Sequence, residues 1–386
     1  MHQHSHFNIP NLFLSYLKNK ELDEFYLSVA MRSFAESFIG IFVPIYLYLL
    51  GLSIREIAFY YLVGFLCVGF FTYFGMIIVS KIGIKKTLAV GTVISIGYYI
   101  SLYLVGQGLP YFIAALVWGI GTAIYYSGFH SELSKFTDRK NEGREYSFLK
   151  VIIIGATALG PVIGSLLIIN FSFPILFLIV SLFLIFSSFP LFLSNDLKIK
   201  KPSTSFKEII TSDTPKMGLH YKILAILEAT GALFWPLFIF IILGSILNLG
   251  IIITISSFIT IFVVLHIGRL SDKKNKLAFG IGTWGSSISW VLRLISLVPF
   301  TIFLINFYWD IMKSFLEISF SKLVYQKAKK AKNLANYLVF REIHLTIGRV
   351  ILLVLLIIVQ SLEFLFIFCF FATFLLLFNF KKNKKV

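Results

Sequence analysis

The chain contains one short stretch twice, as Ile41-Phe42-Val43-Pro44-Ile45 and, 192 residues later, as Leu233-Phe234-Trp235-Pro236-Leu237. The same interval relates Glu36 to Glu228 and Lys81 to Lys273. The two stretches align without gaps, so the second half of the chain reads as a copy of the first. The two halves are therefore predicted to share one fold.

The composition excludes a water-soluble globule. Hydrophobic residues make up 58% of the chain, 43 residues are Phe, and the mean hydropathy is +0.88. Only 14% of residues are charged, against about a quarter in soluble domains. Runs such as 175–193 show no period-two alternation, which a membrane-spanning barrel strand requires. The chain is therefore predicted to be an all-α integral membrane protein.

Twelve apolar runs of roughly 20 residues recur along the chain, each long enough to cross a bilayer as a helix. The predicted spans begin near Phe25, Glu56, Thr87, Tyr111, Phe148, Leu176, Lys222, Ile251, Leu277, Thr301, Leu334 and Phe364. A polar stretch separates the first six from the last six, which predicts two pseudo-symmetric six-helix bundles. The predicted divisions are an N-terminal segment 1–24, a first bundle 25–194, a linker 195–221, a second bundle 222–380 and a basic tail 381–386.

The predicted topology explains where the basic residues behind the net charge of +17 lie. With a cytoplasmic N-terminus, 29 of the 35 Lys and Arg residues fall on the inner side, and only Arg55 lies in an outer loop. This distribution obeys the positive-inside rule and puts both termini of a multi-pass plasma (inner) membrane protein in the cytoplasm. A nucleic-acid partner is not needed to explain the charge.

Cofactors and metals have no evident site in the sequence. Cys67 and Cys369 fall within apolar spans, where a thiol behaves as a small hydrophobe. His2, His4 and His6 lie in a terminal tract without a cysteine or carboxylate to complete a metal site. The first 24 residues carry no removable signal. We expect no metal and no cofactor.

Two loops on the predicted inner side carry related motifs. The stretch from Gly268 to Lys276, with Leu270, Asp272 and Lys273, resembles the Gly-x-Leu-Ala-Asp-Arg-x-Gly-Arg-Lys loop of the major facilitator superfamily. The copy between spans two and three keeps Lys81 and Gly83, but Ser80 stands where the acid belongs.

The resemblance implies the fold of that superfamily: twelve helices in two bundles around a central cavity, with a monomer as the default. It also implies that Asp272 latches an inner gate. The residues themselves allow simpler roles, because Gly268 permits close helix packing, Asp272 can face a helix N-terminus, and the lysines can anchor the loop at an anionic surface.

Ionisable residues within spans point to a polar pathway, because each costs roughly 2.5–3.5 kcal/mol in mid-bilayer. Glu36 lies about 20 Å from the predicted inner boundary, and a carboxyl group at that depth suits proton coupling. Arg32, one turn away, allows the alternative of a structural ion pair. Glu228, the repeat counterpart of Glu36, is a second coupling candidate. With span seven beginning near Lys222, Glu228 is expected only about 9 Å from the inner end of that span.

Other polar and aromatic residues in spans are candidates for the substrate cavity or its gate. The substrate candidates are Asp310, Trp309, Arg349, Tyr126 and Trp235. The rings of Trp235 and Trp309 could stack on an apolar or cationic solute. Arg341 and Glu342 lie nearer the inner end and are expected in a gate. In an aromatic-rich chain such rings also serve simply to contact lipid or neighbouring helices.

Gly160-Pro161-Val162-Ile163-Gly164 on span five is similar to part of the antiporter motif Gly-Pro-x-x-Gly-Gly, with Ser165 in place of the last Gly. Pro161 and the two glycines permit bending and close packing. The motif slightly favours efflux, although Gly and Pro are common in membrane helices generally.

The leading prediction is a non-enzymatic secondary active transporter that moves a small solute by alternating access, with protons as the coupling ion. The chain has no Gly-x-x-x-x-Gly-Lys-Ser/Thr phosphate loop for a self-contained ATP-driven pump. Two alternatives remain open: a non-transporting sensor or assembly protein of the same fold, and a membrane-embedded lipid-modifying enzyme. The enzyme would use His130 with Glu132, or His344 with Glu342, as acid and base.

Overall fold

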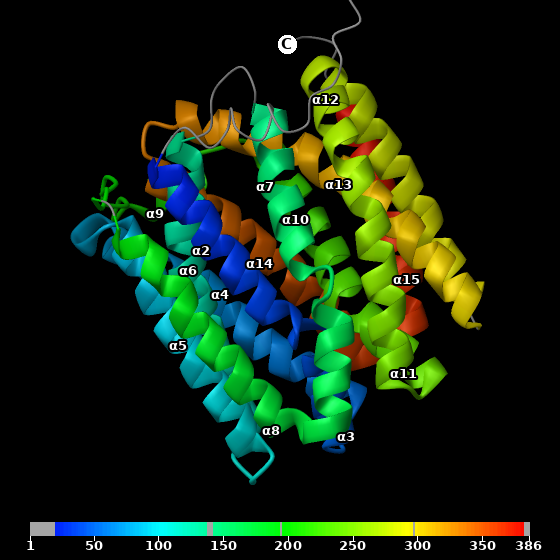
Figure 1. Ribbon diagram of the computed structural model, residues 1–386. Helices are drawn as coiled ribbons and strands as arrows, with labels where there is room; N and C mark the ends of the chain where they lie inside the picture. Colours follow the sequence, from blue (N-terminus) through cyan, green and yellow to red (C-terminus); the bar gives the residue numbers. More distant parts are fainter. Residues whose placement is uncertain (1–19, 137–141, 194, 296–297, 382–386) are drawn as a thin grey trace, which may run out of the picture.

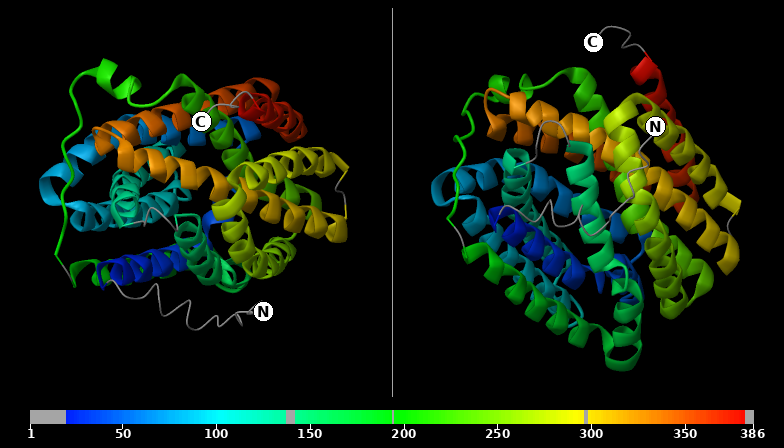
Figure 2. Two further views of the ribbon diagram at one scale, coloured as in Figure 1. Left: turned by 90° about the horizontal axis from the view of Figure 1, so that it is seen from above. Right: turned by 45° about the horizontal axis from the view of Figure 1, so that its top comes forward.

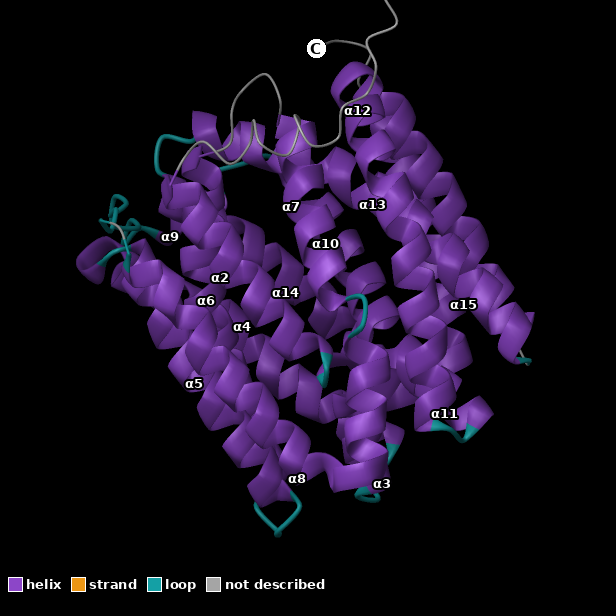
Figure 3. Ribbon diagram, viewed as in Figure 1, coloured by secondary structure: helices purple, strands orange, loops and turns teal. Residues whose placement is uncertain are grey.

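The computed structural model describes residues 20–136, 142–193, 195–295 and 298–381. Within these residues the regular elements are all helical (Figure 3), and the long helical segments pack side by side (Figure 1). The N-terminal segment up to residue 19, with its histidines, and the last five residues of the basic tail lie outside the described residues.

The first half contains the helices that correspond to predicted spans one to six. They are α2 (Lys20–Ser37), η1 (Gly40–Phe42), α3 (Val43–Leu49), α4 (Ile54–Ile82), α5 (Ile84–Val105), α6 (Tyr111–Phe136), α7 (Glu142–Thr157) and α8 (Gly160–Ser188). Non-helical dihedrals at Ser172 divide α8 into the end of span five and span six.

The second half repeats this pattern after η2 (Phe189–Phe192) and the short linker helix α9 (Phe206–Ile210). Its helices are α10 (Pro215–Ala229), η3 (Thr230–Phe234), α11 (Trp235–Leu243), α12 (Ile246–Leu292), η4 (Arg293–Ile295), α13 (Pro299–Lys330), α14 (Leu334–Val359) and α15 (Leu362–Lys381). A break at Lys274 divides α12 into spans eight and nine. Figure 2 shows the linker passing around the outside of the bundle between the halves.

The repeated proline interrupts the first segment of each half in the same way. Pro44 lies in the first turn of α3, after the 3₁₀ turn η1, and Pro236 lies in the first turn of α11, after the π-helical turn η3. A proline has no N–H to donate and clashes with the preceding turn, so the regular α-helix stops before it and restarts. The duplication seen in the sequence is therefore also a duplication of local structure.

The outer surface of the bundle is apolar. In the part of the chain that the structure describes, eight segments are long and apolar enough to cross a membrane, and a shorter apolar helix covers Leu362–Leu376. Large side chains such as Phe70 and Phe262 are 64% and 75% exposed on the bundle surface, where water would make their exposure unfavourable and lipid would not. The prediction of an all-α integral membrane protein is confirmed.

Two ends of the bundle are distinguished by their connections (Figure 1). The basic end carries the α4–α5 turn at Gly83, the α12 break at Lys274 and the start of α10. The opposite, short-loop end carries the α5–α6 turn near Gly108 and the tips of α3 and α11.

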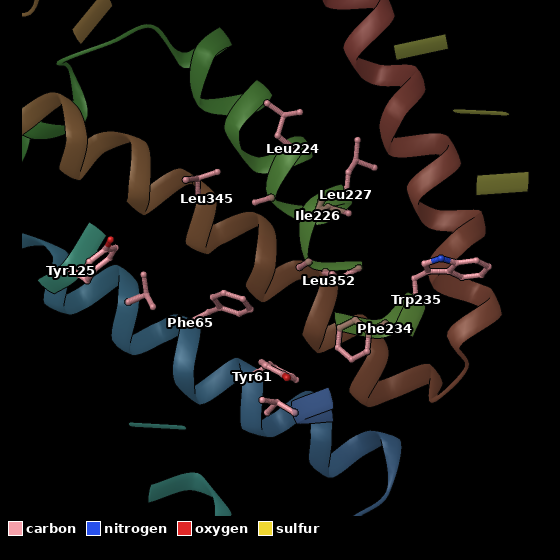
Figure 4. Packing of buried hydrophobic residues seen from close by; sticks show 14 of the residues in the cluster. Tyr61, Phe65, Tyr125, Leu224, Ile226, Leu227, Phe234, Trp235, Leu345 and Leu352 are labelled. Atoms are coloured by element: carbon pink, nitrogen blue, oxygen red, sulfur yellow. The ribbon is translucent and has the colours of Figure 1, made fainter. Parts of the chain in front are cut away.

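The two halves pack together along their lengths. Helix α4 lies against α14, and α7 and α8 lie against α12. Close to the short-loop end, the rings of Tyr61 on α4 and Phe234 on η3 meet edge to face, with centroids 6.2 Å apart (Figure 4). Gly250 of α12 lies so close to α8 that an added Cβ would come within 2.6 Å of the Pro161 carbonyl oxygen.

Candidate functional site

A cavity of about 590 Å³ lies between the two halves. This volume is in the range of sites that hold small molecules. The wall from the first half is aromatic and hydroxyl-bearing, and it includes Phe65 on α4 and Trp118, Thr122, Tyr126 and His130 on α6. The wall from the second half carries the ionic groups, namely Glu228 on α10, Lys313 and Glu317 on α13, and Arg341, Glu342 and Arg349 on α14.

Helix α14 supplies one group of ion pairs in this wall. Nη1 of Arg349 lies 2.6 Å from Oε1 of Glu342, and Nη1 of Arg341 lies 3.7 Å from Oε2 of the same carboxylate. The guanidinium carbon of Arg349 also lies 4.7 Å from the ring centre of Phe65. One carboxylate is thus shared by two arginines that both line the cavity.

A second group joins the halves through α13. Lys313 lies 3.4 Å from Glu317 one turn along the same helix, and Lys150 of α7, in the first half, also pairs with Glu317. These side chains are only partly exposed, which makes the pairs less screened than surface ion pairs. Again one carboxylate is shared by two cations.

Glu228 makes no hydrogen bond or ion pair with any other described residue, although it lines the cavity. Its sequence counterpart Glu36 has Arg32 four residues earlier, whereas the residue four before Glu228 is Leu224. The structure also corrects its depth: α10 begins at Pro215, seven residues before the expected start at Lys222, so Glu228 is further from the helix start than the 9 Å expected.

Arg32 and Glu36 form a packed network inside the first half. Nη2 of Arg32 lies 2.6 Å from Glu36, and the guanidinium donates to Thr92 and Ser95 on α5 at 3.0 and 2.9 Å. Its central carbon also lies 3.7 Å from the ring centre of Tyr125. Among the described residues that line the cavity, neither Arg32 nor Glu36 appears.

Trp235, Trp309 and Asp310 were expected at the substrate cavity, but the structure places them around Arg293, which is fully buried. The guanidinium carbon of Arg293 lies 4.4 Å from the ring of Trp235 and 4.6 Å from that of Trp309. Asn306 joins the group, accepting from Trp235 Nε1 at 3.0 Å and donating to Asp310 at 3.1 Å. Of the expected cavity residues, Tyr126 and Arg349 line the cavity.

The halves touch at both ends of the cavity. Toward the basic end, Nδ1 of His130 on α6 and the hydroxyl of Tyr325 on α13 are hydrogen-bonded at 3.1 Å. At the short-loop end, the rings of Tyr48 on α3 and Phe240 on α11 lie 6.5 Å apart. Both contacts join a residue of the first half to a residue of the second.

The loop motif of the second half joins two helices of that half. Asp272 pairs at 3.2 Å with Lys322 of α13, whose ammonium group also donates to backbone carbonyls of the loop. Gly268 is buried and Lys273 is exposed. The ion pair between Asp272 and Lys322 thus links α12 to α13.

The acidic group at the loop motif of the first half is Asp196, which lies in the linker sequence. Gly83 has a φ of +104°, which favours glycine, and an added Cβ would lie 2.3 Å from the Asp196 carboxylate. That carboxylate accepts from the backbone N–H groups of Lys85 and Lys86 at 2.9 and 3.0 Å. It therefore caps the start of α5, the arrangement that helix N-termini favour. Lys81 is exposed.

The Gly-Pro motif marks a helix break that serves close packing. Helix α7 ends at Thr157, and Pro161 lies in the first turn of α8, which begins at Gly160. An added Cβ at Gly164 would lie 1.9 Å from the carbonyl oxygen of Phe38, and one at Gly160 would meet Ser37. The glycines thus let α8 approach the end of α2 more closely than any side chain allows.

The acid–base pairs of the enzyme alternative are not assembled at His344 and Glu342. His344 bonds to the carbonyl of Phe340 at 2.9 Å, while Glu342 is engaged by Arg349. The described residues contain no group of three or more His, Cys, Asp or Glu that could hold a metal ion.

Several contacts had no signal in the sequence. Lys150 lies near the predicted start of span five, and its pairing with Glu317, 167 residues later, follows only from how the halves dock. Asp196 was assigned to the linker, although it caps a helix 111 residues earlier. Leu224 in place of an arginine was a readable signal that Glu228 lacks the partner of Glu36.

Comparisons with known proteins agree with this geometry. A model of the Major Facilitator Superfamily matches residues 25–243. A search of curated proteins finds no match. Among solved structures, a bacterial homologue of the iron transporter ferroportin, crystallised in an outward-facing state, is similar with a TM-score of 0.67 and 12% sequence identity. The similarity covers 94% of this chain and 99% of that one, and at such low identity it shows the fold alone. The family match spans more than half of the chain, which therefore belongs to the major facilitator superfamily of membrane transporters.

Proposed function

We propose that this protein is a secondary active transporter that carries a small solute across the cytoplasmic membrane by alternating access. The observation that carries the proposal is the cavity of about 590 Å³ between the halves, which both halves line and whose described lining includes six Lys, Arg and Glu side chains. Six such groups within an apolar bundle are costly unless they serve a polar pathway. The basic end is the cytoplasmic end in this proposal, because lysines gather there.

The coupling ion is a proton, and Glu228 is its binding group. A carboxylate that lines the cavity without an ion-pair partner can gain and lose a proton without first breaking a salt bridge. Glu36 is held instead by Arg32, so we assign that pair to the structure of the first half. Lys313, Arg341, Glu342 and Arg349, together with Tyr126, bind the solute.

The gate at the basic end is formed by His130 with Tyr325 and by Lys150 with Glu317. Both contacts join the halves, so both must open when the cavity is exposed to the cytoplasm. Asp272 and Lys322 keep α12 and α13 together as one rigid part of the second half during this motion.

Reconstituted liposomes test the proposal. Protein is incorporated into liposomes loaded with a pH-sensitive dye, and a panel of radiolabelled organic anions, cations and neutral solutes is applied as gradients. We expect at least one solute to exchange and to move protons in wild type. In Glu228→Gln the solute should still exchange, while its flux no longer moves protons. Exchange no faster than in protein-free liposomes for the whole panel would contradict the transporter assignment.

Glu208→Gln is the matched control, because Glu208 lies exposed on the linker helix α9. It should retain both solute exchange and proton movement. If Glu228→Gln also retains proton movement, the coupling role belongs to another group.

A further inference from the structure

The balance of charge around the cavity points to the class of solute that the site binds. Four cations, Lys150, Lys313, Arg341 and Arg349, share two carboxylates, Glu317 and Glu342. Each carboxylate therefore has one close cationic partner and a second, more distant one. For Glu342 the distances are 2.6 Å to Arg349 and 3.7 Å to Arg341. The cationic groups therefore have more capacity for anions than the two carboxylates fill.

Glu228 is the third carboxylate of the cavity. Facing it from the neighbouring helices are Lys313, Glu317 and Tyr325 on α13, Arg341, Glu342 and Arg349 on α14, Tyr126 and His130 on α6, and Tyr221 on its own helix. When Glu228 is ionised, it supplies part of the missing negative charge. When it is protonated, the cations of the second half lack that charge.

More distant charges do not reverse this balance. Arg32 and Glu36 neutralise each other at 2.6 Å. Asp310 is not among the described cavity-lining residues and accepts from Asn306, and its charge interacts with both Lys313 and Arg293. Counting all of these groups still leaves one cation in excess when Glu228 is ionised and two when it is protonated.

The opposite wall sets the shape of the solute. Phe65, Trp118, Tyr126 and Phe129 present aromatic rings to the cavity, and such rings stack favourably on a flat apolar body. These four rings lie on the first half, and the six charged side chains that line the cavity lie on the second, so a solute with one charged end and one apolar end contacts both halves at once.

We propose that the transported solute is an organic anion with an aromatic or apolar body, which binds between Arg341, Arg349 and Lys313 together with a proton on Glu228. The inference rests on the proposed transport function and specifies its substrate class. Because the proton removes the competing carboxylate charge, proton and anion assist each other. They then travel in the same direction, so an inward proton gradient drives uptake, in contrast to the efflux that the Gly-Pro motif favours.

Binding to the full-length protein in lipid nanodiscs tests the inference without transport. The probes are benzenesulfonate, which stays anionic, and benzylammonium, a cation with a ring of the same size. We expect benzenesulfonate to bind and benzylammonium not to bind. The Kd for benzenesulfonate should be about tenfold lower at about pH 5.5 than at about pH 7.5, the size expected for one neighbouring charge.

The variants separate the roles of the groups. Glu228→Gln mimics the protonated acid and should bind benzenesulfonate at about pH 7.5 as tightly as wild type does at about pH 5.5. Arg341→Gln and Lys313→Gln should each weaken binding about tenfold. Both are tolerable for folding, because Glu342 keeps Arg349 and Glu317 keeps Lys150 as partners.

Lys207→Gln, an exposed lysine of α9, and Glu208→Gln should bind like wild type. Preferential binding of benzylammonium, binding of Mn²⁺ in place of the anion, no binding of either organic probe, or weaker anion binding in Glu228→Gln would each overturn the inference. Such results leave the transporter assignment standing if solute exchange is seen in liposomes, so the two failures are distinguishable.

Discussion

Arg32 lies 2.6 Å from Glu36 within α2, while Glu228, related to Glu36 by the 192-residue repeat, has a leucine at the position of that arginine. Two equivalent glutamates therefore differ in their surroundings. The first belongs to a hydrogen-bonded network with α5, and the second lines the cavity between the halves. Arg32 in the first half and Leu224 in the second account for this difference between equivalent positions.

Removing Arg32 should destabilise the protein much more than neutralising Glu36. Arg32→Ala leaves Glu36 without its partner and Thr92 and Ser95 without their donor, so we expect the free energy of unfolding to fall by about 3–5 kcal/mol. In Glu36→Gln the amide oxygen still accepts from Arg32, and the loss should be about 1 kcal/mol. Thermal melting in detergent measures both. An equal loss in the two variants would contradict the network.

Gly164 should not tolerate a methyl group, whereas Gly155 should. The Cβ of Gly164→Ala would lie 1.9 Å from the Phe38 carbonyl oxygen. Because the backbone must shift to make room, we expect the free energy of unfolding to fall by about 1–3 kcal/mol. At Gly155, on α7, an added Cβ meets nothing within 4 Å, and Gly155→Ala should be neutral or stabilising by up to about 1 kcal/mol. Reversal of this order in melting temperature would argue against the close approach of α8 and α2.

Asp196 should act as a helix cap supplied from outside the helix it caps. Asp196→Ala removes both acceptors for the backbone N–H groups of Lys85 and Lys86. We therefore expect the free energy of unfolding to fall by about 1–2 kcal/mol. Asp196→Asn keeps one acceptor oxygen, so its free energy of unfolding should fall by less than that of Asp196→Ala. The measurement is again the melting temperature, and an asparagine variant as unstable as the alanine variant would show that the charge, and not the acceptor, matters.

Lys150 should hold the basic end closed. Lys150→Gln removes a contact between the halves but leaves Glu317 paired with Lys313, so the open population should rise. We expect a Thr122→Cys reporter in the cavity to react roughly fivefold faster with a water-soluble thiol reagent, in a background without Cys67 and Cys369. A fivefold change corresponds to a contribution of about 1 kcal/mol by the Lys150–Glu317 ion pair to the stability of the closed state. Lys207→Gln is the control, and slower labelling in Lys150→Gln would contradict the gate.

Most of the fold could be predicted from sequence because hydropathy and repetition are local properties. The breaks at Pro44 and Pro236 follow from the chemistry of proline, and the loop at Lys274 follows from its charge. The start of α10 was predicted too late because Lys222 and His220 look polar, although the helix continues back to Pro215.

The candidate site could be predicted only in part. Tyr126, Glu228, Arg341, Glu342 and Arg349 are found at the cavity, since spans four, seven and eleven line it. Trp235 and Trp309 were assigned to it because their helices line it, but the side of a helix on which a ring lies depends on partners such as Arg293. The pairs Lys150–Glu317 and His130–Tyr325 depend on how two halves dock, which no local pattern encodes.

The central claim is that the halves rock about the cavity, and pulsed electron–electron distance measurements test it most directly. Spin labels at Ile82 and Lys330 report the basic end, and labels at Leu49 and Ile241 report the short-loop end, all exposed positions. Each pair should show two distances, and Lys150→Gln or a change of pH should lengthen one pair while shortening the other. Distances that stay single under every condition, or that lengthen at both ends together, would contradict alternating access.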